Sequence, residues 1–509
     1  MIVYPNLEEY VNQRLPNDLI LALGSDSGFV SSRNTIRLTS PVLTVLTVLL
    51  LLDAPARAQT LSDPSLSIDS GFSVTGLSAP TTMAFLSPNE ILVLQKGDGQ
   101  VRYVVSGALQ GAPVLDVNVN DASERGLLGI AINTEDPPGV FLFYTEADGS
   151  DGNTPLGNRV YRYDWNDMTQ QLENPQLILD LPVLPGANHD GGIVLLGPTG
   201  EAPGFGDGSI LYAVIGDLNR NGQLENFPAG AMPDDTAVIL RVRQDGSAVP
   251  GNPFTPFCSI TTTRTCPGGG GCPGGETCVS EVAKYYAYGV RNSFGMALDP
   301  LTGNLWDTEN GPGTNDEVNR VPAGFNSGWE QIMGLDADDP QGPGDLFDMP
   351  GAGSTYSDPE FTWFDTTAPT SIVFPFGSRL GPAYNNVAVV GDNNSGQLFR
   401  FPLDGARAAF DFSAFSALQD LVADDNSERD LLSIGTGFGV ITDLEIGPDG
   451  ALYVVSLSGG SITRIIGPGQ PKVPALGCAG ILLLVVLLAL APWFAAGRTL
   501  TGMKSRRAG

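Results

Sequence analysis

His189 is the only histidine in this chain of 509 residues. It lies in the sequence Asn188-His189-Asp190-Gly191-Gly192, directly before an apolar run. Because imidazole titrates near neutral pH, His189 is the one side chain of this type that could act as a general base. The two glycines permit a ligand or another backbone segment to come close, and Asn188 and Asp190 could orient the ring. A hydrogen-bonded structural histidine is the alternative.

A second polar cluster, Tyr288-Gly289-Val290-Arg291-Asn292, precedes another apolar run. An arginine in this place can bind an anionic group or stabilise developing negative charge, and a structural salt bridge is the alternative. The segment 309–317 follows, with Gly311 and Pro312 beside several carboxylates. Backbone carbonyls next to carboxylates suit Ca²⁺, although a plain tight turn explains the segment equally well.

A weaker metal candidate is the loop that contains Asp217, Asn219 and Asn221. Its alternating oxygen ligands and Gly222 are typical of calcium loops, but no glutamate stands at the twelfth position, which excludes an EF-hand. The chain also lacks a glycine-rich nucleotide loop and the G-x-S-x-G motif of serine hydrolases.

A structural unit that repeats between residues 70 and 467 is expected to position these clusters. One unit recurs: an apolar strand, a turn, a second apolar strand, and a third strand that carries an arginine. The first strands are expected to begin near Met83, Leu128, Ile193, Met296, Ala383 and Leu444, and the arginines are Arg102, Arg162, Arg241, Arg320, Arg400 and Arg464. Six such units predict an all-β fold, a six-bladed β-propeller, in which the arginines are structural.

Composition agrees with this fold and limits the partners. The 64 glycines and 39 prolines, against 16% charged residues, favour short strands joined by turns. A formal charge of −30 excludes nucleic acid as a partner. The insertions 201–208, 256–278 and 334–351 are expected on the rim of the propeller, where they could shape a cleft.

Both ends of the chain carry apolar segments. Residues 1–58 are expected to be a lead and a secretory signal cleaved after Ala58, and residues 59–69 a linker. Residues 468–509 contain an apolar stretch, 476–496, which is long enough to span a bilayer and is followed by basic residues. The chain is therefore expected to be exported, with a periplasmic or cell-surface domain. A permanent membrane anchor and a removable sorting tail both fit the C-terminal end.

Four cysteines lie in the insertion 256–278, at positions 258, 266, 272 and 278. An oxidising compartment would favour two disulfides there, with three pairings possible. A zinc site is the alternative, although the spacing lacks a CxxC pair.

Several motifs over residues 70–467 together resemble the glucose/sorbosone dehydrogenase family. They are Glu124-Arg-Gly-Leu-Leu-Gly-Ile-Ala131, His189-Asp-Gly-Gly192, Leu211-Tyr-Ala-Val-Ile-Gly-Asp217, Pro250-Gly-Asn-Pro-Phe254, Tyr288-Gly-Val-Arg-Asn292, Gly311-Pro312 with Asp316-Glu-Val-Asn319, and Gly324-Phe-Asn-Ser-Gly-Trp329.

The resemblance implies a soluble sugar dehydrogenase that uses pyrroloquinoline quinone and Ca²⁺ on a six-bladed propeller. It implies His189 as the general base, Arg291 with Asn292 at the reactive carbonyls of the quinone, and Asp316 assisting near the base. It further implies that the backbone carbonyls of Gly311 and Pro312 hold Ca²⁺.

The last third of the chain departs from the family pattern. Where the family has arginines that clamp the carboxylates of the cofactor, this chain reads Gly439-Val440-Ile441-Thr442-Asp443, and Asn393 or Asn394 replaces a lysine.

Two functions follow from the sequence. The first is an exported enzyme that oxidises a sugar or a related alcohol. The second is a non-catalytic propeller that binds a carbohydrate or a protein at the cell surface. A Ca²⁺-dependent lactone hydrolase is a weaker third option, by analogy of fold alone. The sequence identifies neither the substrate nor the electron acceptor.

Overall fold

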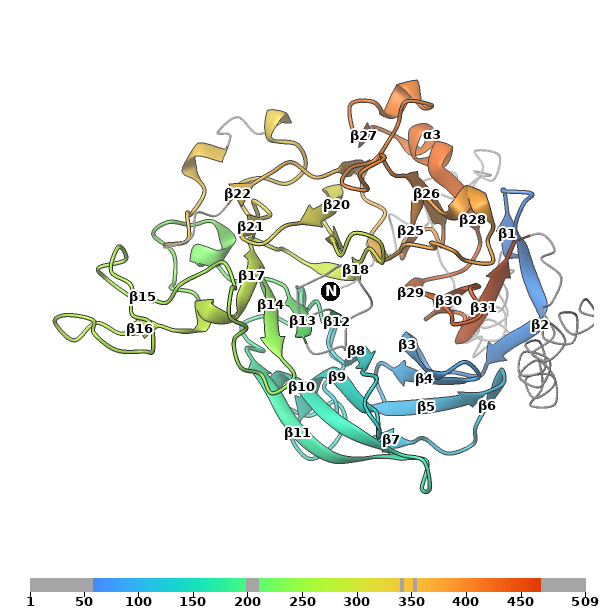
Figure 1. Ribbon diagram of the computed structural model, residues 1–509, viewed down its shortest axis with the longest axis horizontal. Coiled ribbons are helices and arrows are strands. Elements are labelled where there is room, and N and C mark those ends of the chain that lie inside the picture. The colour runs from blue at the N-terminus through green and yellow to red at the C-terminus, as the bar shows by residue number, and fades with distance from the viewer. Residues whose placement is uncertain (1–57, 198–209, 339–342, 351–354, 468–509) are drawn as a thin grey trace, which may run out of the picture. The chain divides into compact units, whose positions relative to one another are not determined.

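A computed structural model describes residues 58–197, 210–338, 343–350 and 355–467, and these residues form an all-β propeller. Figure 1 shows its sheets following one another around an axis. Within the described residues, no helix has the length and apolar character needed to cross a membrane. The expected signal segment, apart from Ala58, and the expected tail 468–509 lie outside the described residues.

Six sheets of at least four strands follow the order of the chain. The first contains β3 (Pro80–Ser87), β4 (Glu90–Gln95), β5 (Gln100–Val105), β6 (Ala108–Leu109) and β7 (Leu115–Asp116). The second contains β8 (Leu127–Ile132), β9 (Gly139–Ala147), β10 (Pro155–Asn166) and β11 (Gln171–Leu181). The third contains β12 (Val194–Gly197), β13 (Ile210–Ile215), β14 (Val238–Arg243), β17 (Tyr285–Tyr288), β21 (Phe325–Asn326) and β22 (Thr355–Tyr356).

The remaining sheets complete the described fold. The fourth contains β18 (Ser293–Leu298), β19 (Leu305–Glu309), β20 (Thr314–Val321), β23 (Phe361–Asp365) and β27 (Val422–Ala423). The fifth contains β24 (Pro369–Val373), β25 (Val387–Asp392), β26 (Leu398–Pro402), β28 (Ser433–Thr436) and β1 (Thr60–Leu61). The sixth contains β29 (Ile441–Ile446), β30 (Leu452–Ser456), β31 (Ser461–Ile466) and β2 (Ser67–Thr75). The short helix α3 (Asn426–Arg429) precedes β28.

The ring closes through contacts between the innermost strands. β3 contacts β8, β8 contacts β12, β12 contacts β18, β18 contacts β24, β24 contacts β29, and β29 contacts β3. The N-terminal strands complete this closure, because β2 pairs with β31 and β1 pairs with β28. Residues 59–69, which the sequence suggested as a linker, therefore contribute β1 and the start of β2 to the sheets.

The hydrophobic core consists of six clusters, and each lies between two neighbouring sheets. Because the sheets pack face to face, strands buried on both faces read as continuous apolar runs, as in Ile210–Ile215, where every residue is buried. The core therefore fixes the inner strands, and the loops that lead into those strands are held in place by them.

One expected first strand is placed wrongly by the sequence. The innermost strand of the fifth sheet is β24, whereas Ala383 lies in a 3₁₀ turn over Pro382–Tyr384. The apolar residues around this Gly-Pro turn imitate the start of a strand. The six repeated arginines all lie on the third strands as expected, at Arg102, Arg162, Arg241, Arg320, Arg400 and Arg464.

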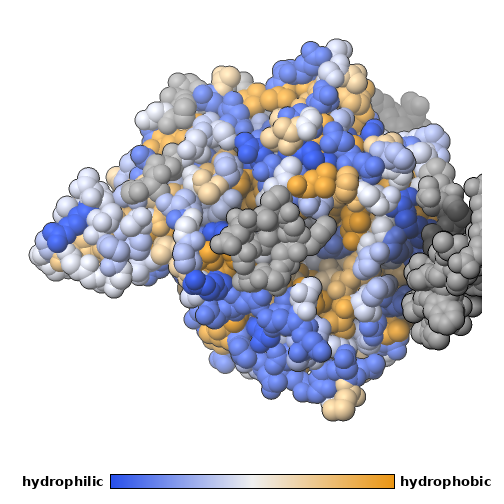
Figure 2. All heavy atoms as spheres, viewed as in Figure 1, coloured by the Kyte–Doolittle hydropathy of each residue, from blue (hydrophilic) through white to orange (hydrophobic). Residues whose placement is uncertain are grey.

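The cysteine-rich insertion contains the two-stranded sheet of β15 (Phe257–Cys258) and β16 (Cys278–Val279) and projects at the left of Figure 1. Figure 2 shows this projection as mostly hydrophilic or neutral. Two disulfides, Cys258–Cys272 and Cys266–Cys278, hold it. The disulfide prediction is confirmed, the structure selects one of the three pairings, and the zinc alternative is wrong because the thiols are oxidised.

We expect peptide mapping of the non-reduced protein by mass spectrometry to recover only these two pairings. Cleavage at Arg264 and at Glu276 should leave all three cysteine peptides joined until a reductant is added, and fragmentation of the joined species in the mass spectrometer assigns the two bonds. A Cys258–Cys266 or Cys258–Cys278 linkage would contradict the structure of this insertion.

Candidate active site

His189 and Asp217 form a hydrogen-bonded pair at one end of the third sheet. His189 Nδ1 lies 2.5 Å from Asp217 Oδ1, and the indole Nε1 of Trp329 donates to Asp217 Oδ2 at 2.8 Å. The backbone N–H of Asn219 also donates to Asp217 Oδ1, at 2.7 Å. A carboxylate only accepts hydrogen bonds, so the proton resides on Nδ1 and Nε2 is left as a proton acceptor. This is the arrangement that a general base requires.

The backbone around His189 is also fixed. His189 has φ +62°, in the left-handed region that residues other than glycine seldom adopt. Its N–H donates to Glu124 Oε2 at 2.5 Å, and Asn292 Nδ2 donates to the same oxygen at 3.0 Å. Glu124 precedes β8, so one carboxylate connects the starts of the second, third and fourth sheets.

Asp190, which the sequence assigned together with Asn188 to orient the imidazole, makes no hydrogen bond to the ring. Asp190 Oδ1 instead accepts from Asn158 Nδ2 at 2.9 Å and lies 3.8 Å from Arg125 Nε. Asn188 Oδ1 accepts from the hydroxyl of Ser123. The expectation for Asp190 is wrong, because Asp190 is held by the second sheet and by the loop before it, and the ring is hydrogen-bonded to Asp217 instead.

Arg291 reaches the same region from the loop before β18. Its guanidinium lies 5.1 Å from the ring centroid of Trp329, and its Nη1 donates to the carbonyl of Asn310 at 2.6 Å. Its backbone N–H donates to Glu309 Oε1 at 2.6 Å. Burial lowers the pKa of the guanidinium, while nearby Asp217 and Glu309 act in the opposite direction. Trp329 thus contacts both Asp217, the partner of His189, and Arg291.

Unpaired polar atoms gather next to this cation. Arg291 Nε, Asn292 Oδ1 and Asn310 Oδ1 are buried and have no hydrogen-bond partner among the described residues. Gly311 and Pro312 follow Asn310 in the turn between β19 and β20. Buried polar atoms are nearly always paired in proteins, so these atoms are suited to bind a polar group that is supplied from outside the chain.

Comparisons with known proteins identify the family of this chain. Residues 77–260 and 269–464 match the family model described as "Glucose / Sorbosone dehydrogenase". The chain belongs to the glucose/sorbosone dehydrogenase family. Quinoprotein glucose dehydrogenase B from Acinetobacter calcoaceticus is 26% identical over 287 residues, which are 52% of this chain and 53% of that protein. The chain thus matches about half the length of that relative. Aldose sugar dehydrogenase YliI from Escherichia coli is 22% identical over 387 residues, covering 75% of this chain and 87% of that protein.

Solved structures show the same fold. The PQQ-bound form of an aldose sugar dehydrogenase from Streptomyces coelicolor has a TM-score of 0.54 at 22% identity, covering 79% of this chain and 98% of that one. The apo form of the soluble aldose sugar dehydrogenase from Escherichia coli has a TM-score of 0.57 at 21% identity, covering 79% of this chain and 99% of that one.

The loop with Asp217, Asn219 and Asn221 uses its carboxylate differently from a calcium loop. Both oxygens of Asp217 already accept hydrogen bonds, one of them from His189. Within the described part of this glucose/sorbosone dehydrogenase-family chain, the one group of three metal-type ligand atoms within 4.8 Å of one another belongs to disulfide cysteines. The weaker metal candidate therefore gains no support.

The positions where the family carries a cofactor clamp hold no cation here. Asn394 Nδ2 donates to the carbonyl of Thr366 at 3.2 Å, and Gly439 lies against Ser456 and Ser458. Lys96, which the sequence had not singled out, lies near Glu124 and Asp190, and its Nζ donates to the carbonyl of Asp121 at 2.9 Å. Burial lowers its pKa, while Asp121, Asp190 and Glu124 counteract this effect.

Asp316 holds two loops together. Its Oδ1 accepts from the N–H of Gly311 at 2.8 Å, and its Oδ2 accepts from the N–H groups of Thr367 and Ala368 at 2.6 Å each. Burial raises the pKa of Asp316 to about 6. These contacts make Asp316 a residue that positions the turn of Gly311 and Pro312 against the fifth sheet.

We expect Asp316→Asn to lower stability and activity together. An amide nitrogen would face a backbone N–H on one side, so at least one buried donor would lose its acceptor, at about 1–3 kcal/mol. Urea unfolding measures this loss, and Asp365→Asn, at the exposed end of β23, is the matched control. An unchanged free energy of unfolding for Asp316→Asn would contradict the positioning role.

Proposed function

We propose that this chain oxidises a sugar or a related alcohol by hydride transfer to pyrroloquinoline quinone, with His189 as the general base. The pair of His189 and Asp217 carries this proposal, because it holds the single imidazole in the tautomer that accepts a proton. The family match and the PQQ-bound relative of the same fold support the choice of cofactor. We further infer that the six sheets are six blades.

One end of the site fits the quinone and its metal. Arg291 Nε is an unpaired donor, and Asn292 Oδ1 and Asn310 Oδ1 are unpaired acceptors, so Arg291 and Asn292 would hold the reactive end of the quinone. The carbonyls of Gly311 and Pro312 would hold Ca²⁺, which takes oxygen ligands of this kind. When bound, the quinone with its Ca²⁺ supplies the hydride acceptor.

Residues of the chain would remove the proton from the substrate hydroxyl and stabilise the charge that results. His189 Nε2 accepts the proton of the substrate hydroxyl as the carbon–hydrogen bond is broken, and Asp217 stabilises the imidazolium that results. Trp329 keeps Asp217 in place through its indole N–H. Glu124 fixes the backbone of His189 and the side chain of Asn292, so that base and cofactor contacts keep their relative positions.

The other end of the site fits the quinone less well. The segment 439–443 and Asn393 or Asn394 offer no cation where the family pattern has arginines and a lysine. Each missing charged hydrogen bond would have contributed about 1.5–3 kcal/mol to cofactor binding. We therefore expect the chain to release the cofactor more readily than a family member that keeps the clamp. The same loss favours the second candidate function, a non-catalytic propeller that binds a carbohydrate or a protein.

We also propose that the domain works outside the cytoplasm. Two disulfides in the cysteine-rich insertion support this location, since such bonds persist in oxidising compartments. The apolar segments near both ends of the sequence agree with export.

Reconstitution tests the function. The purified chain is mixed with pyrroloquinoline quinone and Ca²⁺, and an artificial electron acceptor is followed across a panel of aldoses and alcohols. Turnover that depends on the quinone and on His189 would support the dehydrogenase. Absence of quinone binding would refute the dehydrogenase and leave the binding propeller. Turnover that is indifferent to His189→Ala would refute His189 as the general base.

A further inference from the structure

A cavity of about 690 Å³ lies along the axis of the propeller. Its lining includes residues from the innermost strands of all six sheets and continues to the turns at their far ends, where Phe376 is 48% exposed. His189, Asp217, Arg291 and Gly311 do not line it. The cavity is therefore distinct from the candidate active site, which lies at the starts of the same strands.

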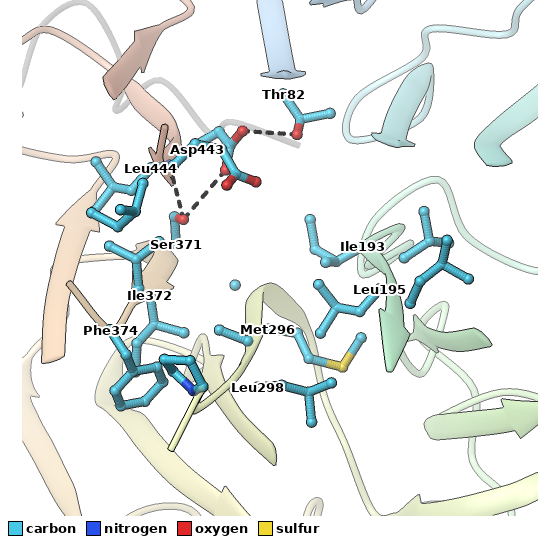
Figure 3. Close-up of a pocket in the computed structure, with 18 of the residues that line it drawn as sticks. Thr82, Ile193, Leu195, Met296, Leu298, Ser371, Ile372, Phe374, Asp443 and Leu444 are labelled. Atoms are coloured by element: carbon cyan, nitrogen blue, oxygen red, sulfur yellow. Dashed lines mark hydrogen bonds between the residues drawn. The ribbon is translucent and has the colours of Figure 1, made fainter. Parts of the chain in front are cut away.

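Most of the cavity wall is apolar. Figure 3 shows apolar side chains from the innermost strands of three sheets, or next to them, around the space: Ile193, Leu195, Met296, Leu298, Ile372 and Phe374. The volume lies in the range of small-molecule sites, which are typically apolar with a few polar groups. The wall thus suits an organic group of moderate size.

The charged residues of the wall are all acids. Asp299, Asp443 and Glu445 line the cavity, and no lysine, arginine or histidine of the described residues does. Asp299 is neutralised, because Arg407 Nε lies 2.6 Å from its Oδ2. Asp443 and Glu445 remain without a cation in the described structure.

The two carboxylates differ in their neighbours. Asp443 accepts from the Thr82 hydroxyl and the Met83 N–H, both at 2.9 Å, and lies 3.4 Å from the Ser371 hydroxyl. Glu445 lies two residues further along β29, and its carboxylate has no hydrogen bond or ion pair among the described residues. Burial raises the pKa of both groups, that of Asp443 to about 7. A cation in the cavity would offset the free-energy cost of keeping these two buried carboxylates charged.

We propose that the axial cavity binds a small organic cation, a protonated amine with an apolar body, with Glu445 as its counter-ion. The ammonium group would pair with the unpartnered carboxylate, and the hydrocarbon part would replace water against the aliphatic wall. A bare metal ion fits less well, because Asp443 already has three neutral donors, the volume far exceeds one ion, and the wall offers few oxygen ligands.

This proposal is independent of the dehydrogenase reaction and is tested by calorimetry on the full chain. Hexylammonium chloride, 1-hexanol and sodium hexanoate have the same hydrocarbon and differ only in charge. We expect hexylammonium to bind at least 10-fold more tightly than 1-hexanol, and hexanoate more weakly than either. Equal affinities, or a preference for hexanoate, would overturn the proposal without any mutation.

Glu445→Gln provides the second test. It should reduce the preference for hexylammonium over 1-hexanol by at least 10-fold while the affinity for 1-hexanol changes less than 2-fold. The matched control is Glu428→Gln in α3, away from the axis, which should leave all three affinities unchanged. An unaltered preference in Glu445→Gln would refute the role of Glu445. Binding of CaCl₂ alone that Glu445→Gln abolishes, without any binding of hexylammonium, would assign the cavity to a metal and overturn the proposal.

Discussion

His189→Ala should reduce kcat of the reconstituted enzyme by about 10²–10⁴-fold, the usual contribution of a positioned general base. No second histidine exists in the chain to replace it. Because Asp217 Oδ1 keeps the N–H of Asn219 as a donor when the imidazole is removed, the substitution should leave the propeller folded. Steady-state kinetics over a range of pH measure the loss, and KM should change much less than kcat.

Two further measurements separate base catalysis from a structural role. Added imidazole should restore part of the activity of His189→Ala, since it supplies the missing proton acceptor. Asp217→Asn should also lower kcat, because an amide can donate to Nδ1 and so favour the tautomer whose proton is on Nε2. A His189→Ala enzyme with activity within threefold of the unmodified chain would exclude His189 as the base.

The sequence predicted the propeller because its signal is periodic. Apolar strands, turns and third-strand arginines repeat often enough to define the units, and only the fifth first strand was misplaced, at Ala383 instead of β24. The turn around Ala383 is apolar and contains glycine and proline, so local composition does not separate it from a strand start.

The site was predictable in part. His189, Arg291 and the Gly311 turn were found because polar residues interrupt the repeat at the starts of strands or between them. Glu124 occupies the equivalent place before β8 and could have been found by the same reasoning. Trp329 belongs to a motif of the family resemblance, but its contact with Asp217 could not be predicted. The two residues are 112 positions apart along the chain, and only the folded ring brings the indole to the carboxylate.

The partner of the imidazole shows why spacing alone misleads. Asp190 is adjacent to His189 in sequence, but the positive φ of His189 and the N–H bond to Glu124 direct the ring to Asp217 on the next loop. The oxygen-rich pattern at Asp217 resembles a calcium loop in sequence, and its actual use is visible only when the neighbouring strand is in place.

Gly216→Ala should lower both stability and activity, although Gly216 contributes no side chain to the candidate site. A Cβ at this position would lie 2.3 Å from the carbonyl oxygen of Arg291 and 2.4 Å from that of His189. Both obstacles are backbone atoms, so the loops that carry the base and the cation would have to move apart. We expect a loss of about 1–3 kcal/mol of stability, as for overpacked cores, and a fall in kcat of about 10²-fold.

Gly111→Ala is the matched control, because a Cβ there has nothing within 4 Å. Thermal unfolding and kinetics of both variants, with and without the quinone, measure the effects. The substitution leaves His189, Asp217 and Arg291 chemically intact, so a loss of activity must arise from their displaced positions. If Gly216→Ala kept full activity and stability, the close approach of the two loops would not be required, and the arrangement of base and cation would not depend on the packing described above.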